Sequence, residues 1–127
     1  MSVSFDPEQG LVVVRAELVG PAGTAVLRLA LDTGATSTLV NVGMLVAIGY
    51  DPALVAERTQ VTTGSGVEYV PRVPIRAIKV LGHTRHDLAV LAHTLPPSAS
   101  VDGLLGLDFF RGRTITIDFQ AGHVDMK

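Results

Sequence analysis

The sequence LALDTGATSTLV, residues 29–40, is the stretch around which the rest of the chain is organised. Its first three residues end an alternating apolar segment that is typical of a half-buried β-strand. Asp32 follows directly, and a second β-branched, apolar segment begins a few residues later. We expect a carboxylate at the end of such a strand to be half-buried, which is the setting in which its protonation can be tuned for acid–base chemistry.

The segments on either side of this stretch predict β-structure. Residues 10–19 are rich in β-branched side chains and predict a strand. Residues 20–23 have turn composition, and residues 25–31 alternate so that Leu27, Leu29 and Leu31 share one face. Together they predict a hairpin that places Asp32 at its end.

The middle of the chain predicts a short helix and a second hairpin. After a short strand at 37–40, Asn41 can cap a helix over residues 42–48, with Gly49 as its stop. Residues 58–62 and 67–70 flank Thr63-Gly64-Ser65-Gly66, a strong hairpin signal. Pro71 and Pro74 favour an edge position or a bulge in the returning strand.

The last third of the chain predicts further short strands. In chain order we expect strands at 75–81 and 86–91 joined by a turn at Gly82, a loop at 95–98, an apolar run at 103–105, a helical turn at 107–110, and strands at 114–119 and 124–126. Short strands with frequent turn signals and little helix predict an all-β barrel or folded sheet, with residues 1–127 as one domain.

Composition excludes several classes of function. Hydrophobic residues make up 47% of the 127 residues and charged residues 17%, which suggests a surface buried against a partner, most simply a second copy. The sequence has no membrane-length apolar run, and residues 1–10 do not resemble a signal peptide, so we expect a soluble cytoplasmic protein. The absence of cysteine excludes disulfides and thiol nucleophiles. A net charge of −2 with no basic cluster gives no reason to expect nucleic acid.

Two motifs carry a resemblance to a known family. Asp32-Thr33-Gly34-Ala35, after apolar residues, resembles the catalytic signature of retropepsin-like aspartic proteases. VDGLLGLDFF, residues 101–110, resembles the later motif of that family, in which two apolar residues and a glycine lead into a short helix. A glycine-rich candidate flap, residues 62–66, lies between them. The pattern is closer to the cellular and bacterial members than to the viral ones.

The resemblance implies an all-β, retropepsin-like acid-protease half-barrel with one or two short helices, acting as a homodimer. Peptide hydrolysis without a metal, cofactor or covalent nucleophile needs one group to take a proton from water and another to give one to the substrate. Two carboxylates that share a proton can do both. The chain has one Asp-Thr-Gly, so the resemblance implies that Asp32 faces its twin across a two-fold axis.

The same resemblance implies roles for the neighbouring residues. Thr33 would hydrogen-bond across the dimer axis, and Gly34 would let the backbone turn close to the carboxylate. Ala35 would line the substrate cleft, and Gly106 would let its strand pack tightly beside the Asp32 loop.

The candidate flap has a role under the same resemblance. Gly64, Ser65 and Gly66 would form a flap tip that closes over a peptide or protein substrate bound as an added strand.

The sequence departs from the viral members at one ion pair. Their acidic residue after the Asp-Thr-Gly-Ala unit pairs with an Arg after the second-motif glycine, and here Thr36 and Leu107 stand at those places. Asp108 with Arg111 or Arg113 is the candidate replacement.

Other interpretations of the same residues remain open. Asp-Thr-Gly by itself also fits an ordinary turn between two strands. We expect Asp102 and Asp108 to act as helix-capping or helix-dipole residues. His83 and His86 would lie on opposite faces of a strand, so we expect solvated surface histidines and no metal site. The functional alternatives are a catalytically silent retropepsin-like dimerisation or peptide-binding domain and an unrelated β-sandwich adaptor.

Overall fold

The computed structural model describes the backbone of residues 1–127 and every side chain except that of Thr63. The strands are β1 (Ser2–Ser4), β2 (Val13–Gly20), β3 (Gly23–Leu31), β4 (Leu39–Asn41), β5 (Arg58–Thr63), β6 (Gly66–Val80), β7 (His83–His93), β8 (Gly103–Leu105), β9 (Ile115–Asp118) and β10 (His123–Met126). The helices are α1 (Val42–Ala47) and α2 (Leu107–Phe110), with 3-10 turns η1 (Pro52–Leu54) and η2 (Pro97–Ala99).

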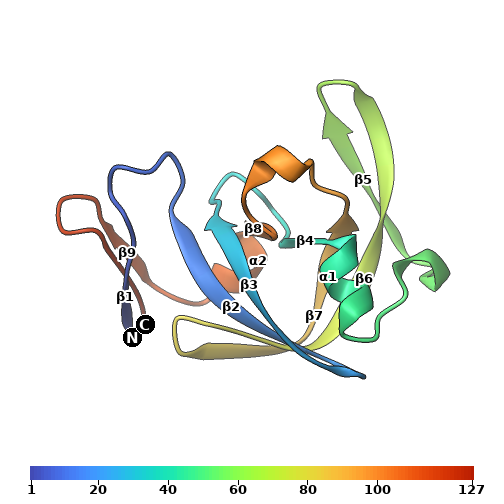
Figure 1. The fold of residues 1–127 in the computed structure, drawn as a ribbon, viewed down its shortest axis with the longest axis horizontal. Coiled ribbons are helices and arrows are strands. Elements are labelled where there is room, and N and C mark those ends of the chain that lie inside the picture. The colour runs from blue at the N-terminus through green and yellow to red at the C-terminus, as the bar shows by residue number, and fades with distance from the viewer.

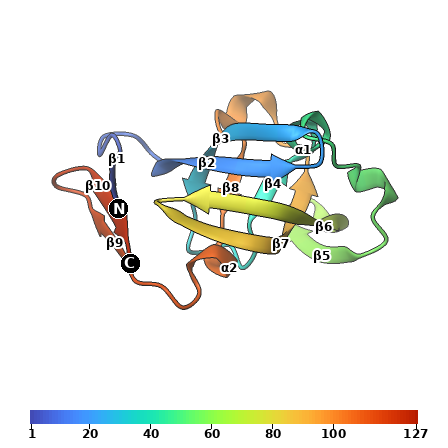
Figure 2. The same cartoon turned by 90° about the horizontal axis from the view of Figure 1, so that it is seen from below.

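Six of the strands close into a barrel. They follow the order β2-β3-β8-β4-β7-β6, and β2 also pairs with β6 to complete the ring. β5 pairs with the far half of β6, so this hairpin projects beyond the barrel (Figure 1). A second sheet, β1-β10-β9, holds both chain termini at the opposite end of the molecule (Figure 2). The prediction of an all-β fold with short helices is confirmed.

The β2–β3 hairpin forms as its alternation predicts. Leu18, Leu27 and Leu29 are fully buried in the barrel, whereas Val26 and Arg28 on the other face of the hairpin are exposed. Burying each such leucine contributes on the order of 2 kcal/mol. β3 runs straight into Asp32, so the packing of the barrel determines where the carboxylate lies.

Helix α1 begins where predicted, after the Asn41 cap, and ends at Ala47, one residue before the predicted end. The Asn41 side chain accepts a hydrogen bond from the Gly43 N–H at 3.1 Å, which satisfies one of the free donors of the first turn. Gly49 follows with φ +99°, a conformation that glycine adopts without strain. A side chain at Gly49 would also meet the Ala22 backbone nitrogen at 2.8 Å.

β6 is longer than its sequence predicts. It continues through Pro71 and Pro74, and it merges the two expected strands into one of 15 residues. β6 is not an edge strand, but Pro74 lies between the part that pairs with β5 and the part that pairs with β2. The neighbouring Arg76 N–H donates to the Tyr50 hydroxyl at 2.8 Å, which in turn donates to the Val19 carbonyl. Tyr50 thus bridges β6 and β2 next to the position where proline cannot donate.

Strand β1 is not predicted by the sequence. Its three residues pair with β10, and the ring of Phe5 meets that of Phe119 edge-on with centroids 5.8 Å apart. A three-residue strand has no readable periodicity, and the pairing that defines it comes from the other end of the chain. Over its described residues the fold has no helix with the length and apolarity that crossing a bilayer requires.

Candidate active site

Asp32 lies in a tight turn at the end of β3. The half-buried side chain accepts a hydrogen bond from the Gly34 N–H at 2.9 Å, and the Asp32 carbonyl accepts one from the Ala35 N–H at 3.2 Å. A Cβ on Gly34 would lie 3.1 Å from the Asp32 carboxylate oxygen. The turn therefore fixes one carboxylate oxygen against the backbone, while Thr33 and Gly34 remain exposed.

The backbone of this loop, residues 32–38, is docked on the second motif. The Asp32 N–H donates to the Leu105 carbonyl at 3.0 Å, and the Leu107 N–H donates to the Ala35 carbonyl at 2.8 Å. The Asp108 N–H donates to the Thr36 carbonyl at 3.2 Å. Two stretches about seventy residues apart in the sequence are thus brought side by side.

Gly106 stands where the loop and the second motif approach most closely. A Cβ at this position would lie 2.6 Å from the Ser37 carbonyl carbon and 2.8 Å from the Ala35 oxygen. Both are backbone atoms, so a side chain could be accommodated only if the loop moved. The structure thus brings Gly106 together with the Asp32 loop.

Thr38 and Asp108 form a polar contact that the sequence analysis missed. The Thr38 N–H donates to one Asp108 oxygen at 2.9 Å, and its hydroxyl donates to the other at 2.7 Å. The predicted pairing of Asp108 with Arg111 or Arg113 is wrong, because both oxygens of its carboxylate are directed at Thr38. Thr38 is the last of three consecutive hydroxyl residues, Thr36, Ser37 and Thr38, so the sequence alone did not single it out.

Arg85 holds α2 from the other side. Its guanidinium, on β7, donates to the Phe109 carbonyl at 2.8 Å and also to the Arg111 carbonyl. It lies over the Phe109 ring, 5.8 Å from the centroid. A cation therefore satisfies the carbonyls at the end of α2 without any acidic partner, and nothing in the local sequence of β7 predicts this contact.

Asp102 does not cap a helix, so that expectation is wrong. Its carboxylate accepts a hydrogen bond from the Arg28 N–H at 2.8 Å, and its own N–H donates to the Arg28 carbonyl at 2.8 Å. β8 rather than a helix begins at Gly103, so Asp102 extends the pairing of β3 with β8. Asp108 lies in the first turn of α2, as expected, although its carboxylate bonds to Thr38.

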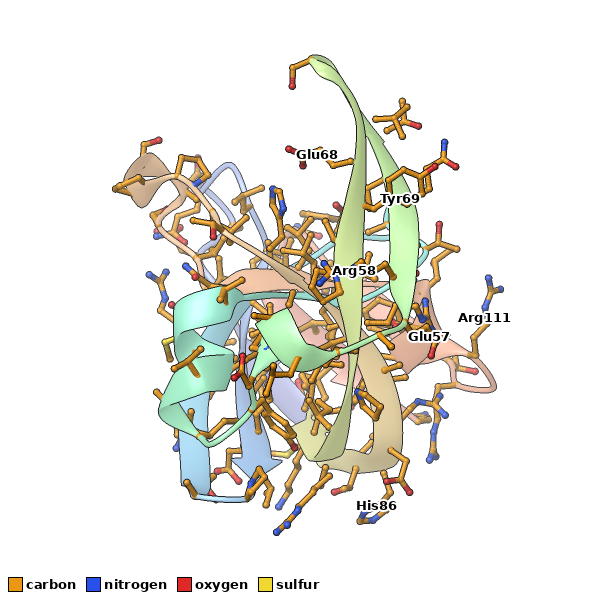
Figure 3. The ribbon with its side chains drawn as sticks, turned by 90° about the vertical axis from the view of Figure 1, so that its right-hand side faces the viewer. Glu57, Arg58, Glu68, Tyr69, His86 and Arg111 are labelled. Atoms are coloured by element: carbon orange, nitrogen blue, oxygen red, sulfur yellow. The ribbon has the colours of Figure 1, made fainter. Side chains whose placement is uncertain are left out.

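The β5–β6 hairpin is the predicted flap segment. Gly64 and Ser65 form its two-residue turn, and Gly66 has φ +131°. Val67 and Tyr69 lie on one face of β6 and are 52% and 66% exposed. Tyr69 and Glu68 point to opposite sides of the hairpin (Figure 3). This pair of exposed apolar side chains was not singled out from the sequence.

Comparisons with known proteins agree with this geometry. Residues 14–109 match a family model described as aspartyl protease. The chain belongs to the aspartyl protease family. A crystal structure of a retropepsin-like aspartic protease from Rickettsia conorii superposes with a TM-score of 0.72 at 14% identity, covering 98% of this chain and 86% of that one. Comparison with curated proteins gives no match. The retropepsin-like family and fold inferred from the two motifs are confirmed.

Two of the four histidines, His83 and His93, are only partly exposed, whereas His86 and His123 are exposed as expected of surface histidines. The ring of His83 is hydrogen-bonded to the Met126 carbonyl at 2.9 Å, joining β7 to β10. His93 lies 3.9 Å from the Glu68 carboxylate, at the border between solvent and protein. Among the described side chains no three potential metal ligands cluster.

The hollows of the surface lie away from the aspartate of this family member. One, of about 610 Å³, is lined by Val3 of β1, Arg15 of β2 and Phe5 between them, among other residues. Another, of about 670 Å³, lies between β6 and the end of β7, beside Tyr69 and His93. Neither hollow is lined by any residue from 29 to 38, so neither encloses the Asp32 carboxylate.

Proposed function

We propose that this chain is an aspartic endopeptidase that acts as a homodimer, with one Asp32 from each subunit activating a water molecule. One observation carries the proposal. The backbone of residues 32–36 is hydrogen-bonded to Leu105, Leu107 and Asp108, so the half-buried Asp32 carboxylate is presented at a fixed place. Membership of the aspartyl protease family supports the same activity.

The chemistry follows from two carboxyl groups that share one proton. The ionised group takes a proton from water, and the water oxygen attacks the peptide carbonyl carbon. The protonated group gives its proton to the carbonyl oxygen. When the tetrahedral intermediate collapses, the C–N bond breaks and the departing nitrogen takes up a proton.

A second copy of the chain would complete this site. Each chain supplies one Asp-Thr-Gly, and Thr33 and Gly34 are exposed at the tip of the turn, where a symmetric partner could contact them. We assign Thr33 to contacts across the axis and Gly34 to the turn itself. A two-fold axis beside Asp32 would bring the two carboxyl groups together.

The flap and the loop would hold the substrate as an extended strand. We assign Ala35, Gly64, Ser65 and Gly66 to substrate binding, with the flap closing over the peptide and excluding water. The exposed Val67 and Tyr69 side chains favour apolar residues in the peptide that is cut.

The test is cleavage of a mixed peptide library across pH with matched variants. We expect Asp32→Asn to lower kcat by about 10³-fold or more, because it removes the shared proton chemistry. Asp51→Asn is the control, since Asp51 also accepts a hydrogen bond from a backbone N–H two residues ahead, Ala53 at 3.2 Å. It should leave cleavage unchanged. Undiminished cleavage by a correctly folded Asp32→Asn variant would contradict the proposal.

A further inference from the structure

A short polar chain links the end of the Asp32 loop to the second motif. Thr38 is 0% exposed, and it is the one polar residue in the buried class among the described side chains. Its hydroxyl donates to Asp108 and accepts from the Gly106 N–H at 3.1 Å. In an apolar surrounding such a chain is stable only when every member has a partner, and no buried side-chain nitrogen or oxygen among the described residues lacks one.

The partners are matched by chemistry as well as by distance. Thr38 offers two donors, its N–H and its hydroxyl, and an ionised carboxylate accepts both with different oxygens. The Thr38 oxygen is then free to accept from Gly106. Replacing either side chain by an apolar one would leave at least one buried N–H or oxygen without a partner.

This chain fixes the far end of the loop that carries Asp32. At the near end, the Asp32 N–H is held by the Leu105 carbonyl, and at the far end Thr38 is held by Asp108. Between these points Ala35 and Thr36 accept backbone hydrogen bonds from Leu107 and Asp108, whereas the Thr33–Gly34 turn is exposed. Both oxygens of the Asp108 carboxylate accept hydrogen bonds from Thr38, so we expect its effect on catalysis to act through the loop.

We propose that Asp108 is a positioning residue that, through Thr38, holds the Asp32 loop in the geometry needed for two carboxyl groups to meet. The inference rests on the proposed peptidase function. A displacement of about 1 Å in a catalytic group costs on the order of 10²-fold in rate. The contact therefore affects the rate of the chemical step rather than the binding of substrate.

Paired variants separate positioning from general stability. Thr38→Val keeps the shape and removes the hydroxyl, whereas Thr38→Ser keeps the hydroxyl. Asp108→Leu removes both acceptors, whereas the amide of Asp108→Asn can accept from the Thr38 N–H and donate to the Thr38 oxygen. Thr24→Val, at an exposed position on β3, is the control for the loss of a threonine hydroxyl.

Kinetics with a cleaved peptide give the first readout. We expect Thr38→Val and Asp108→Leu to lower kcat by about 10²-fold while KM changes little. Thr38→Ser, Asp108→Asn and Thr24→Val should stay within a few-fold of the wild type. An unchanged kcat in Thr38→Val would overturn the proposal. So would a kcat in Asp108→Asn as low as that of Asp108→Leu.

Amide hydrogen exchange gives a second readout that does not depend on activity. In Thr38→Val the amides of residues 33–38 should exchange at least about tenfold faster, with β2, β3 and β6 unchanged. A uniform increase across the barrel would mean a structural role alone and would overturn the proposal. If the wild-type chain cleaves no peptide, the proposed function fails. The exchange experiment still decides whether this contact holds the loop, because faster exchange confined to residues 33–38 supports it and faster exchange across the whole barrel does not.

Discussion

The Asp32 loop and the flap hairpin are both short turns between strands, yet they are built in opposite ways. The loop is docked on β8 and α2 by hydrogen bonds from Asp32, Leu107 and Asp108, and Gly106 leaves no space beneath it. The flap turn projects from the barrel, and a Cβ at Gly64 would meet nothing within 4 Å. One turn is fixed by backbone hydrogen bonds to the second motif, and the other projects beyond the barrel.

This difference corresponds to two requirements of a peptidase. Catalytic groups must be held in place before substrate arrives, because the rate falls steeply with small displacements. A cover must open to admit a peptide and then close to exclude water. The proposed function thus assigns the fixed turn to chemistry and the projecting turn to binding.

The largest expected effect is in amide hydrogen exchange of the two turns. The amides of Asp32 and Leu107 should exchange about 10³-fold more slowly than that of Gly64, since they are hydrogen-bonded within the barrel. Nuclear magnetic resonance of the wild-type chain measures all three in one experiment. Equal exchange rates for the three amides would contradict the conclusion that the Asp32 loop is held more firmly than the flap turn.

The difference in packing between the Asp32 loop and the flap can also be tested by replacing one glycine of each region with alanine and comparing the free energies of unfolding. Gly106→Ala should lower the free energy of unfolding by about 1–3 kcal/mol, because the new Cβ meets loop backbone. Gly64→Ala has open space and should stay within about 0.5 kcal/mol. Chemical denaturation measures both. A neutral Gly106→Ala would show that the loop is free to move.

A smaller effect on the free energy of unfolding is expected from removing one arginine contact beside each region. Arg85→Met removes two hydrogen bonds and a ring contact at α2, which should cost about 1–2 kcal/mol. At the base of the flap, Glu57 pairs with Arg72 at 3.5 Å but is 71% exposed, so Glu57→Gln should cost less than about 0.5 kcal/mol. Thermal unfolding would contradict this ranking if the flap variant melted at the lower temperature.

The smallest effect is expected at the contact between the flap and the end of β7. Glu68 lies 3.9 Å from His93, and its side chain is 53% exposed. Glu68→Gln should change the free energy of unfolding by no more than about 0.5 kcal/mol, because solvent screens such a pair. A change above about 1 kcal/mol in denaturant unfolding would mean that the flap is held to the barrel more firmly than its exposed contacts indicate.

The sequence predicted those parts of the molecule that local patterns specify. Alternation in residues 25–31 placed Leu27 and Leu29 in the core, and Asn41 and Gly49 marked the ends of α1. Two motifs were enough to infer the retropepsin-like family, because each carries residues whose spacing is fixed by the fold.

What the sequence did not predict depends on contacts between distant segments. Strand β1 is defined only by β10, and Arg85 reaches α2 from a strand more than twenty residues away. Asp108 was paired with Arg111 or Arg113 as a replacement for the ion pair of the viral members, because both arginines lie close to it in the sequence. Thr38 instead satisfies both oxygens of the carboxylate, one with its backbone N–H and the other with its buried hydroxyl.

The measurement that tests the central claim most directly is a subunit-mixing titration. Wild-type chain is mixed with the Asp32→Asn variant at constant total concentration, given time to exchange subunits, and assayed for peptide cleavage. If each active site needs an Asp32 from two chains, an equal mixture should retain roughly one quarter of the wild-type activity, because only wild-type pairs are active. Retention of about one half, as expected for independent sites diluted twofold, would contradict the account.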